Sequence, residues 1–285
     1  MPTISRPDGT TINYEVHGSG FPLLLIAPGG VSSEIAFWRR GPIDPIRDFA
    51  SDFTVIAMDQ RFAGKSHAPA KAFSYEDASA DQLAVLDAVG VPQAHVMGGC
   101  IGNAHIWALL QAANGRITSA VCQNPVGLDA TNNTGTFYKM FDDTMRLARS
   151  GGMDAVIQAA IDGPVFAMAN GGGPFSQRLH DDPAFREELR KLTVESYVAL
   201  IVRFRDGLWP DNAPFFTASE AWMRECPVPL IVLPGSDAFH PTGVANRIAE
   251  LAPNAVELDV DCRGPEKLAA TIETVRAFLK ANTPA

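Results

Sequence analysis

A length of 285 residues gives room for one large domain, or for a core domain that carries an insertion. Hydrophobic residues make up 46% of the chain and charged residues 19%, as in ordinary globular proteins. The formal net charge of −9, with no basic cluster to offset it, argues against a nucleic-acid partner and fits a protein that handles small molecules.

Short apolar runs recur along the chain, and most of them stop at a turn or a polar residue. Residues 10–16 alternate apolar and polar side chains after the turn signal Asp8-Gly9, which predicts antiparallel strands at the edge of a sheet. Continuous apolar runs, which are typical of strands buried on both faces, follow at 22–27, 54–58, 95–97, 119–122 and 229–233, with a last strand expected at 255–259.

Helical patterns separate these runs. Ser74 is a predicted N-cap for a helix that ends at Gly90, and a last helix is expected to bury Leu268, Ile272, Val275 and Leu279 on one face. Strands that alternate with helices predict an α/β fold, with a mostly parallel sheet and helices on both of its faces. Ligands of such sheets bind at the carboxyl ends of the strands, so we expect the chemistry in the loops that follow the apolar runs.

The alternation of strands and helices stops between Gln123 and Cys226, where the pattern is helical and rich in aromatic residues. The chain therefore divides into a first core part (residues 1–124), an inserted helical cap (125–225) and a second core part (226–285). A cap that covers a pocket must line part of it, and we expect its Phe137, Phe141 and Trp209 to contact a substrate.

One strand ends in a pattern that carries chemistry. Residues 95–97 run into Gly98-Gly99-Cys100-Ile101-Gly102 and then into an apolar helical stretch. This is a G-x-nucleophile-x-G turn between a strand and a helix, with cysteine as the nucleophile. The tight turn needs small flanking residues, and it places the sulfur at a helix N-terminus, where a thiolate is stabilised. The Ile101 amide then points at the oxygen of an attacked carbonyl.

With this turn, the chain resembles the alpha/beta hydrolases, and the resemblance extends along nearly its whole length. It implies their fold and a hydrolytic activity. Pro28-Gly29-Gly30 resembles the His-Gly-X loop of that family. The resemblance implies that Gly30, or Val31 if the register is shifted by one, completes an oxyanion hole with Ile101. Residues 59–66 resemble the family's D-x-R-G-x-G-x-S stretch.

This chain lacks one residue of that family's catalytic triad at its usual place in the sequence. Gly235-Ser236-Asp237 resembles the loop that carries the triad acid, but the loop 261–265, where the family has its histidine, contains none. No histidine follows His240, which lies three residues beyond Asp237 on a loop that should border the pocket. His240 could therefore act as the base for Cys100, with Asp237 orienting it. The alternative is that His240 only caps or packs its loop.

Three functions remain open at this point. The leading hypothesis is hydrolysis of a small acyl compound (a lactone, an activated ester or a thioester) through Cys100. A thiol with a free pKa of about 8.5 needs less help from a base than an alcohol does, so a cysteine enzyme tolerates a displaced histidine. The same pocket could instead run a lyase reaction or a carbon–carbon bond cleavage, and loss of the triad histidine would also fit a non-catalytic binder of small molecules.

Cofactors and targeting signals leave no trace in the sequence. There is no phosphate-binding loop, dinucleotide fingerprint or metal-ligand spacing, so we expect no cofactor and no metal. The N-terminal segment lacks the features of a secretory signal, and no apolar run approaches the roughly 20 residues of a membrane span. We therefore expect a cytoplasmic protein without membrane contact and with free cysteines, while monomer and homodimer both stay open.

Overall fold

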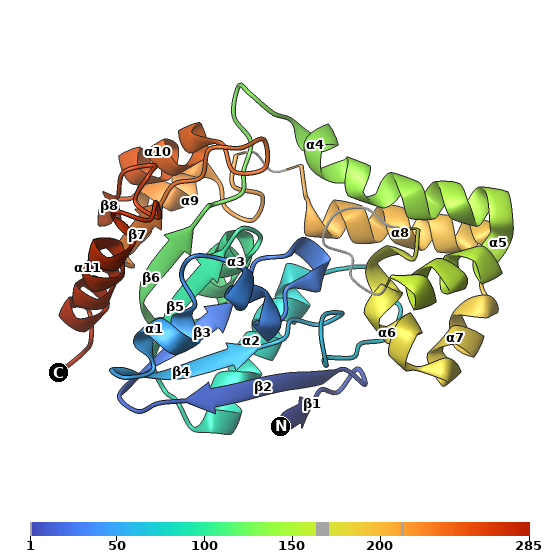
Figure 1. The fold of residues 1–285 in the computed structure, drawn as a ribbon, viewed down its shortest axis with the longest axis horizontal. Helices are drawn as coiled ribbons and strands as arrows, with labels where there is room; N and C mark the ends of the chain where they lie inside the picture. Colours follow the sequence, from blue (N-terminus) through green and yellow to red (C-terminus); the bar gives the residue numbers. More distant parts are fainter. Residues whose placement is uncertain (1, 164–170, 212–213) are drawn as a thin grey trace.

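A computed structural model describes residues 2–163, 171–211 and 214–285 (Figure 1). Within these ranges one sheet has the strand order β1-β2-β4-β3-β5-β6-β7-β8. Strands β1 and β2 are antiparallel to their neighbours at one edge, and the strands from β3 to β8 pair in parallel. The predicted fold class is confirmed: the sheet is mostly parallel and carries helices on both faces.

The strands from β2 to β8 lie within two residues of the predicted runs, whereas β1 has no counterpart among them. Their bounds are β1 Thr3–Ser5, β2 Thr11–His17, β3 Phe21–Ile26, β4 Phe53–Met58, β5 Ala94–Gly99, β6 Ile117–Gln123, β7 Leu230–Leu233 and β8 Ala255–Glu257. The α-helices are α1 Pro45–Phe49, α2 Tyr75–Val89, α3 Gly102–Ala112, α4 Thr134–Tyr138, α5 Asp142–Asp162, α6 Ser176–Asp181, α7 Pro183–Arg190, α8 Val194–Leu208, α9 Glu220–Arg224, α10 Thr242–Leu251 and α11 Leu268–Ala281. Short 3₁₀ helices include η1 Gly30–Ser32 and η2 Ile35–Arg40.

Both faces of the sheet are buried, which explains why the central strands read as continuous apolar runs. In β3, Leu23 and Leu25 face the cluster that contains residues of α1 and α11, whereas Leu24 and Ile26 face the cluster that contains residues of α2, α3, α9 and α10. The alternation of side chains along a strand therefore sends each half of the run into a different hydrophobic layer. This packing fixes the carboxyl ends of β3, β5, β6 and β7 next to one another.

Local capping signals set the bounds of α2. The Ser74 hydroxyl accepts a hydrogen bond from the Asp77 amide at 3.3 Å, and Gly90 ends the helix in the left-handed conformation, with φ 74°. In α11, Val275 and Leu279 are buried as predicted, but Leu268 and Ile272 are only half-buried. The buried stripe of α11 is therefore narrower than its apolar spacing suggests, because the helix lies on an outer face of the sheet.

The described residues between β6 and β7 form helices and no strand, as the sequence pattern predicts. We call residues 125–225 the helical insertion. Its helices α4 to α8 lie together beside the sheet (Figure 1), whereas α9 packs against α10 of the core. Their aromatic core also holds Phe62, from the loop after β4, whose ring centre lies 5.7 Å from that of Phe175 and 5.1 Å from that of Phe204. Phe62 has φ 74°, so this contact keeps a bulky residue in a strained backbone conformation.

No helix of the described ranges is both long and apolar enough to cross a membrane. Cys100, Cys122, Cys226 and Cys262 are all free, and Cys100 alone among them is partly exposed.

Candidate active site

Cys100 occupies the turn between β5 and α3 in a strained conformation. Its φ of 54° lies in the left-handed region, which residues other than glycine rarely adopt. The Cys100 amide donates to the carbonyl of Gln123 at 3.0 Å, and its own carbonyl accepts from the amide and the side chain of Asn103, both at 3.0 Å. Asn103 also donates to the Gln123 carbonyl at 2.8 Å. These bonds hold the turn, and the role of Asn103 carries no signal in the sequence that we used.

The glycines around Cys100 allow the close approach that this turn needs. A Cβ atom on Gly102 would lie 2.4 Å from the carbonyl oxygen of Ile26 in β3, and a Cβ atom on Gly98 would lie 2.7 Å from the carbonyl oxygen of Gly102. Side chains larger than hydrogen would therefore push α3 away from the sheet. The G-x-C-x-G pattern thus has the backbone geometry of a nucleophile elbow.

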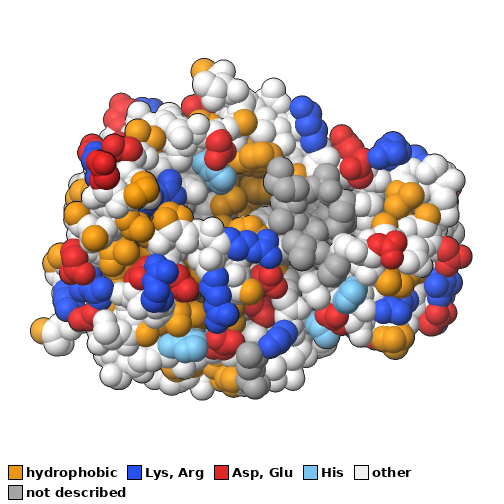
Figure 2. All heavy atoms as spheres, viewed as in Figure 1, with side chains coloured by type: hydrophobic (Ala, Val, Ile, Leu, Met, Phe, Trp, Pro, Cys, Tyr) orange, Lys and Arg blue, Asp and Glu red, His pale blue; other side chains and the backbone are white. Residues whose placement is uncertain are grey.

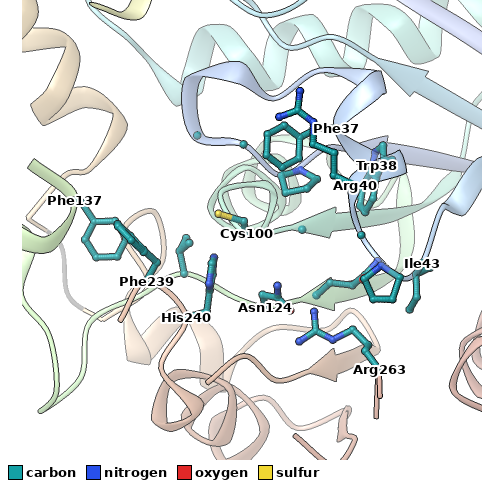
Figure 3. Close-up of a pocket in the computed structure, with 18 of the residues that line it drawn as sticks. Phe37, Trp38, Arg40, Ile43, Cys100, Asn124, Phe137, Phe239, His240 and Arg263 are labelled. Carbon is teal, nitrogen blue, oxygen red and sulfur yellow. The ribbon is translucent and has the colours of Figure 1, made fainter. Parts of the chain in front are cut away.

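The partly exposed Cys100 lines a cavity of about 470 Å³, a size typical of small-molecule pockets (Figure 3). The cavity opens on the face shown in Figure 2, where hydrophobic side chains form the floor of a hollow. Its walls come from the loop after β3, η2, the elbow, the helical insertion, the loop after β7 and the loop after β8. The sulfur therefore lies at the carboxyl ends of the strands, where the sequence predicted the chemistry.

His240 and Asp237 contact each other although they share one short loop. The His240 Nδ1 atom lies 2.9 Å from each carboxylate oxygen of Asp237, and the His240 amide donates to Asp237 Oδ1 at 3.0 Å. The other ring nitrogen, Nε2, is buried and makes no hydrogen bond of good geometry. In Figure 3 the ring of His240 points toward the Cys100 sulfur. The structure thus brings together the three residues that the sequence proposed as nucleophile, base and acid.

The thiol and the imidazole shift each other's pKa in opposite directions. Burial raises the pKa of the Cys100 thiol, but the charge of the nearby His240, together with backbone hydrogen bonds from Ile101 and Gly29, lowers it by a larger amount, so the net pKa lies below its ordinary value. Burial lowers the pKa of His240, but Cys100 and then Asp237 raise it to about 9. Both shifts favour a thiolate beside an imidazolium at neutral pH.

Two backbone amides act on the Cys100 sulfur. One is that of Ile101 and the other is that of Gly29. Gly30, the predicted partner, lines the cavity next to Gly29, whereas the alternative Val31 is 5% exposed, packs in the core of the helical insertion and does not line the cavity. The register of the Pro28 loop therefore favours the glycines over Val31.

The predicted aromatic contacts are partly present. Phe137 and Trp209 line the cavity, and their ring centres are 4.6 Å apart. Phe141 does not line it: its ring is fully buried in the aromatic core of the insertion and lies 6.2 Å from that of Phe204. The expectation for Phe141 is therefore wrong, because the next turn of the chain already lies behind the cavity wall.

Several cavity residues were missed by the sequence reasoning. Phe37 and Arg40 come from η2, Phe239 from the loop after β7, and Arg263 from the loop after β8 where the family has its histidine. The place of Arg263 after the last strand is a signal that could have been used. Among the described residues, no group of three or more histidine, cysteine or acidic side chains is arranged to hold a metal ion.

Comparison with known proteins agrees with this geometry. A sequence model of a family described as "alpha/beta hydrolase fold" matches residues 22–162, which include β3, the elbow and the start of the helical insertion. The chain has the alpha/beta hydrolase fold. The chain is 32% identical over 146 residues to a protein of Azorhizobium caulinodans named "Putative carbamate hydrolase RutD" and 27% identical over 158 residues to one of the same name from Variovorax paradoxus.

Those two matches cover 51% and 54% of the present chain and 51% and 55% of the relatives, so each spans only about half of either protein. Solved structures match over nearly the whole length. An esterase from a Rhodococcus species has a TM-score of 0.61 at 24% identity, with 99% of this chain and 98% of that chain covered. The enol-lactonase from Burkholderia xenovorans has a TM-score of 0.60 at 19% identity, with 98% and 100% covered. At these identities the structural matches show the shared fold.

Proposed function

We propose that this alpha/beta hydrolase hydrolyses a small acyl compound (a lactone, an activated ester or a thioester) with Cys100 as its nucleophile. The observation that carries the proposal is the Cys100 sulfur, which borders a cavity on a strained turn and faces an imidazole that Asp237 holds. The matched relatives named as a carbamate hydrolase, an esterase and an enol-lactonase support a hydrolytic reaction on a small substrate.

The reaction follows from the protonation states of the pair. The Cys100 thiolate attacks the substrate carbonyl, and the resulting oxyanion accepts hydrogen bonds from the amide of Ile101 and from the glycine amides at Gly29 and Gly30. As the carbon–oxygen or carbon–sulfur bond to the leaving group breaks, protonated His240 donates its proton to that group. His240, now neutral, takes a proton from water, which attacks the thioester and releases the acid and the Cys100 thiolate.

Asp237 acts on His240 rather than on the substrate. Its carboxylate holds Nδ1 at 2.9 Å, so Nε2 is the nitrogen left to exchange protons with the thiol and the leaving group. Burial raises the pKa of Asp237, but the hydrogen bond and charge of His240 lower it by a larger amount, so the net pKa lies below its ordinary value. The carboxylate therefore stays charged and stabilises the imidazolium through the reaction.

The helical insertion serves in this proposal as the cap over the site. Phe137, Met140 and Trp209 supply one apolar wall of the cavity. Such a wall limits the access of water to the thioester, so that the attacking water is the one that His240 deprotonates. Such a wall suits the hydrocarbon part of a small acyl compound.

The test compares three variants on 4-nitrophenyl acetate. We expect Cys100→Ala and His240→Ala to lower kcat/KM at least 100-fold, because each removes one reacting group. Cys226→Ala, which changes a buried thiol outside the cavity, should stay within threefold of the unchanged protein. Mass spectrometry of Cys100→Ser during turnover should show an acyl adduct on residue 100.

The other outcomes identify the alternatives. Full activity of Cys100→Ala would show that the thiol is not the nucleophile. Turnover of a substrate without any acyl adduct would favour a lyase or a carbon–carbon bond cleavage. Saturable binding of small acyl compounds with no turnover would favour a binding protein.

A further inference from the structure

The loop after β8 places a guanidinium group where the family has its catalytic histidine. Arg263 lies between β8 and α11, is half-buried and lines the same cavity as Cys100. Figure 3 shows its guanidinium directed into the cavity on the side of Asn124 and Ile43, away from Phe137. The position that would hold a base therefore holds a fixed positive charge.

This charge has no acidic partner within the described residues. Arg263 Nη2 donates to the carbonyl of Pro234 at 2.6 Å, Nε is buried without a hydrogen bond, and no carboxylate lies within ion-pair distance. The groups that raise its pKa are first the buried thiol of Cys262 and then the carboxylate of Asp237, which already binds His240. Burial lowers the pKa of the guanidinium, a sign that the charge is poorly compensated.

The other arginine of the cavity is in a different state. Arg40 is exposed at the rim, lies 4.6 Å from the centre of the Phe37 ring and has Glu34 at 4.0 Å as an acidic partner. Its charge is therefore screened by solvent and by a carboxylate. Of the two cavity arginines, Arg263 is therefore the one whose charge an anionic ligand would neutralise.

We propose that Arg263 binds a carboxylate group of the substrate, so that the acyl compound that reaches Cys100 is an anion. The guanidinium is planar and presents paired N–H donors that match a carboxylate. Figure 3 places Cys100 between the aromatic wall of Phe137 and Phe239 and the guanidinium of Arg263. The geometry thus fits a compound with an apolar end, a central acyl carbonyl and a carboxylate. The position of the carbonyl rests on the proposed function, whereas the carboxylate site does not.

Binding of inert ligands tests the carboxylate site without any turnover. Trp38 and Trp209 line the cavity, so their fluorescence reports ligand binding. We expect 3-phenylpropionate to bind at least tenfold more tightly than the isosteric, neutral 3-phenylpropionamide. Arg263→Gln should remove this preference and leave the Kd of the amide within threefold, and Arg40→Gln should keep the preference. Arg263→Lys should keep part of it, since the charge remains.

A preference that survives Arg263→Gln, or equal binding of acid and amide by the unchanged protein, would overturn the carboxylate site. If Arg263→Gln also weakens binding of the amide, the variant has damaged the cavity and Arg263→Lys decides. An Arg263→Lys variant that prefers the acid supports the site, and one that binds both ligands equally overturns it.

Turnover separates this inference from the proposed function. We expect 4-acetoxybenzoate to be hydrolysed with at least tenfold higher kcat/KM than its methyl ester, and Arg263→Gln to remove the difference. If neither ester is hydrolysed but acid binding still depends on Arg263, the proposed hydrolysis fails and the carboxylate site stands. If both esters are hydrolysed equally well through Cys100, with and without Arg263, the hydrolysis stands and the carboxylate site fails.

Discussion

Replacing His240 by glutamine should raise the pKa of the Cys100 thiol. Glutamine fills a similar space and keeps a polar tip, but it removes the positive charge that lowers this pKa against the effect of burial. Two unit charges about 4 Å apart interact by about 4 kcal/mol at an effective dielectric constant of about 20. The thiol is partly exposed, so solvent screens part of this energy, and we expect a rise of about one to two pKa units.

Alkylation by iodoacetamide measures this change directly, since only the thiolate reacts. With mass spectrometry to quantify the adduct on Cys100, the midpoint of the rate–pH profile should move up by about one to two pH units in His240→Gln, because the thiolate then forms at a higher pH. His180→Ala, which changes an exposed histidine of α6 outside the cavity, is the control and should leave the rate unchanged. Coincident rate–pH profiles for His240→Gln and the unchanged protein would refute the assignment of His240 as the partner of the thiolate.

Three further predictions follow from the site and its supports. Ester hydrolysis needs protonated His240, whose pKa is raised to about 9, so kcat/KM should stay constant up to that pH and fall above it. The rate of Cys100 alkylation should not fall over the same range. A parallel loss of both rates above pH 9 would contradict this. Gly102→Ala should lower the free energy of unfolding in urea by about 2–3 kcal/mol because its Cβ overlaps a carbonyl of β3, while Gly90→Ala, with φ 74° but open space around it, should cost about 1 kcal/mol; equal losses would count against the clash. Phe62→Gly should relieve backbone strain of about 1 kcal/mol but lose about 3 kcal/mol or more of ring packing, so thermal unfolding should move to a lower temperature, and a more stable variant would show that strain outweighs packing.

The sheet could be predicted from the sequence because its signals are local. Strands buried on both faces need apolar residues at every position, and the caps of α2 use a serine and a glycine whose effects do not depend on the rest of the fold. The sequence could not distinguish residues of the cavity wall from residues of the core behind it. Phe137 and Phe141 are four residues apart and both fully buried, yet only Phe137 lines the cavity. Apolar periodicity gives the direction of a side chain but not its depth.

The site was predictable where a turn fixes it. The elbow around Cys100 follows from its glycines, and the contact of Asp237 with His240 comes from a tight turn in which the carboxylate accepts from the Phe239 amide at 2.8 Å and the His240 amide at 3.0 Å. That turn places the ring beside the carboxylate, which spacing along the chain left undecided. The direction of Arg263 depends on the path of a loop across the cavity, so no local pattern could give it.

Because Asp237 and His240 share one loop, the acid and the base of the proposed reaction are positioned together at the end of β7. The segment between β8 and α11 then carries no proton-transfer residue, so the proposed reaction does not constrain its length and composition. Exchange of residues 258–267 for segments of other composition should redirect which compounds enter while the thiol and imidazole keep their alignment. In the proposed reaction, selectivity and reactivity thus depend on two different loops of the chain.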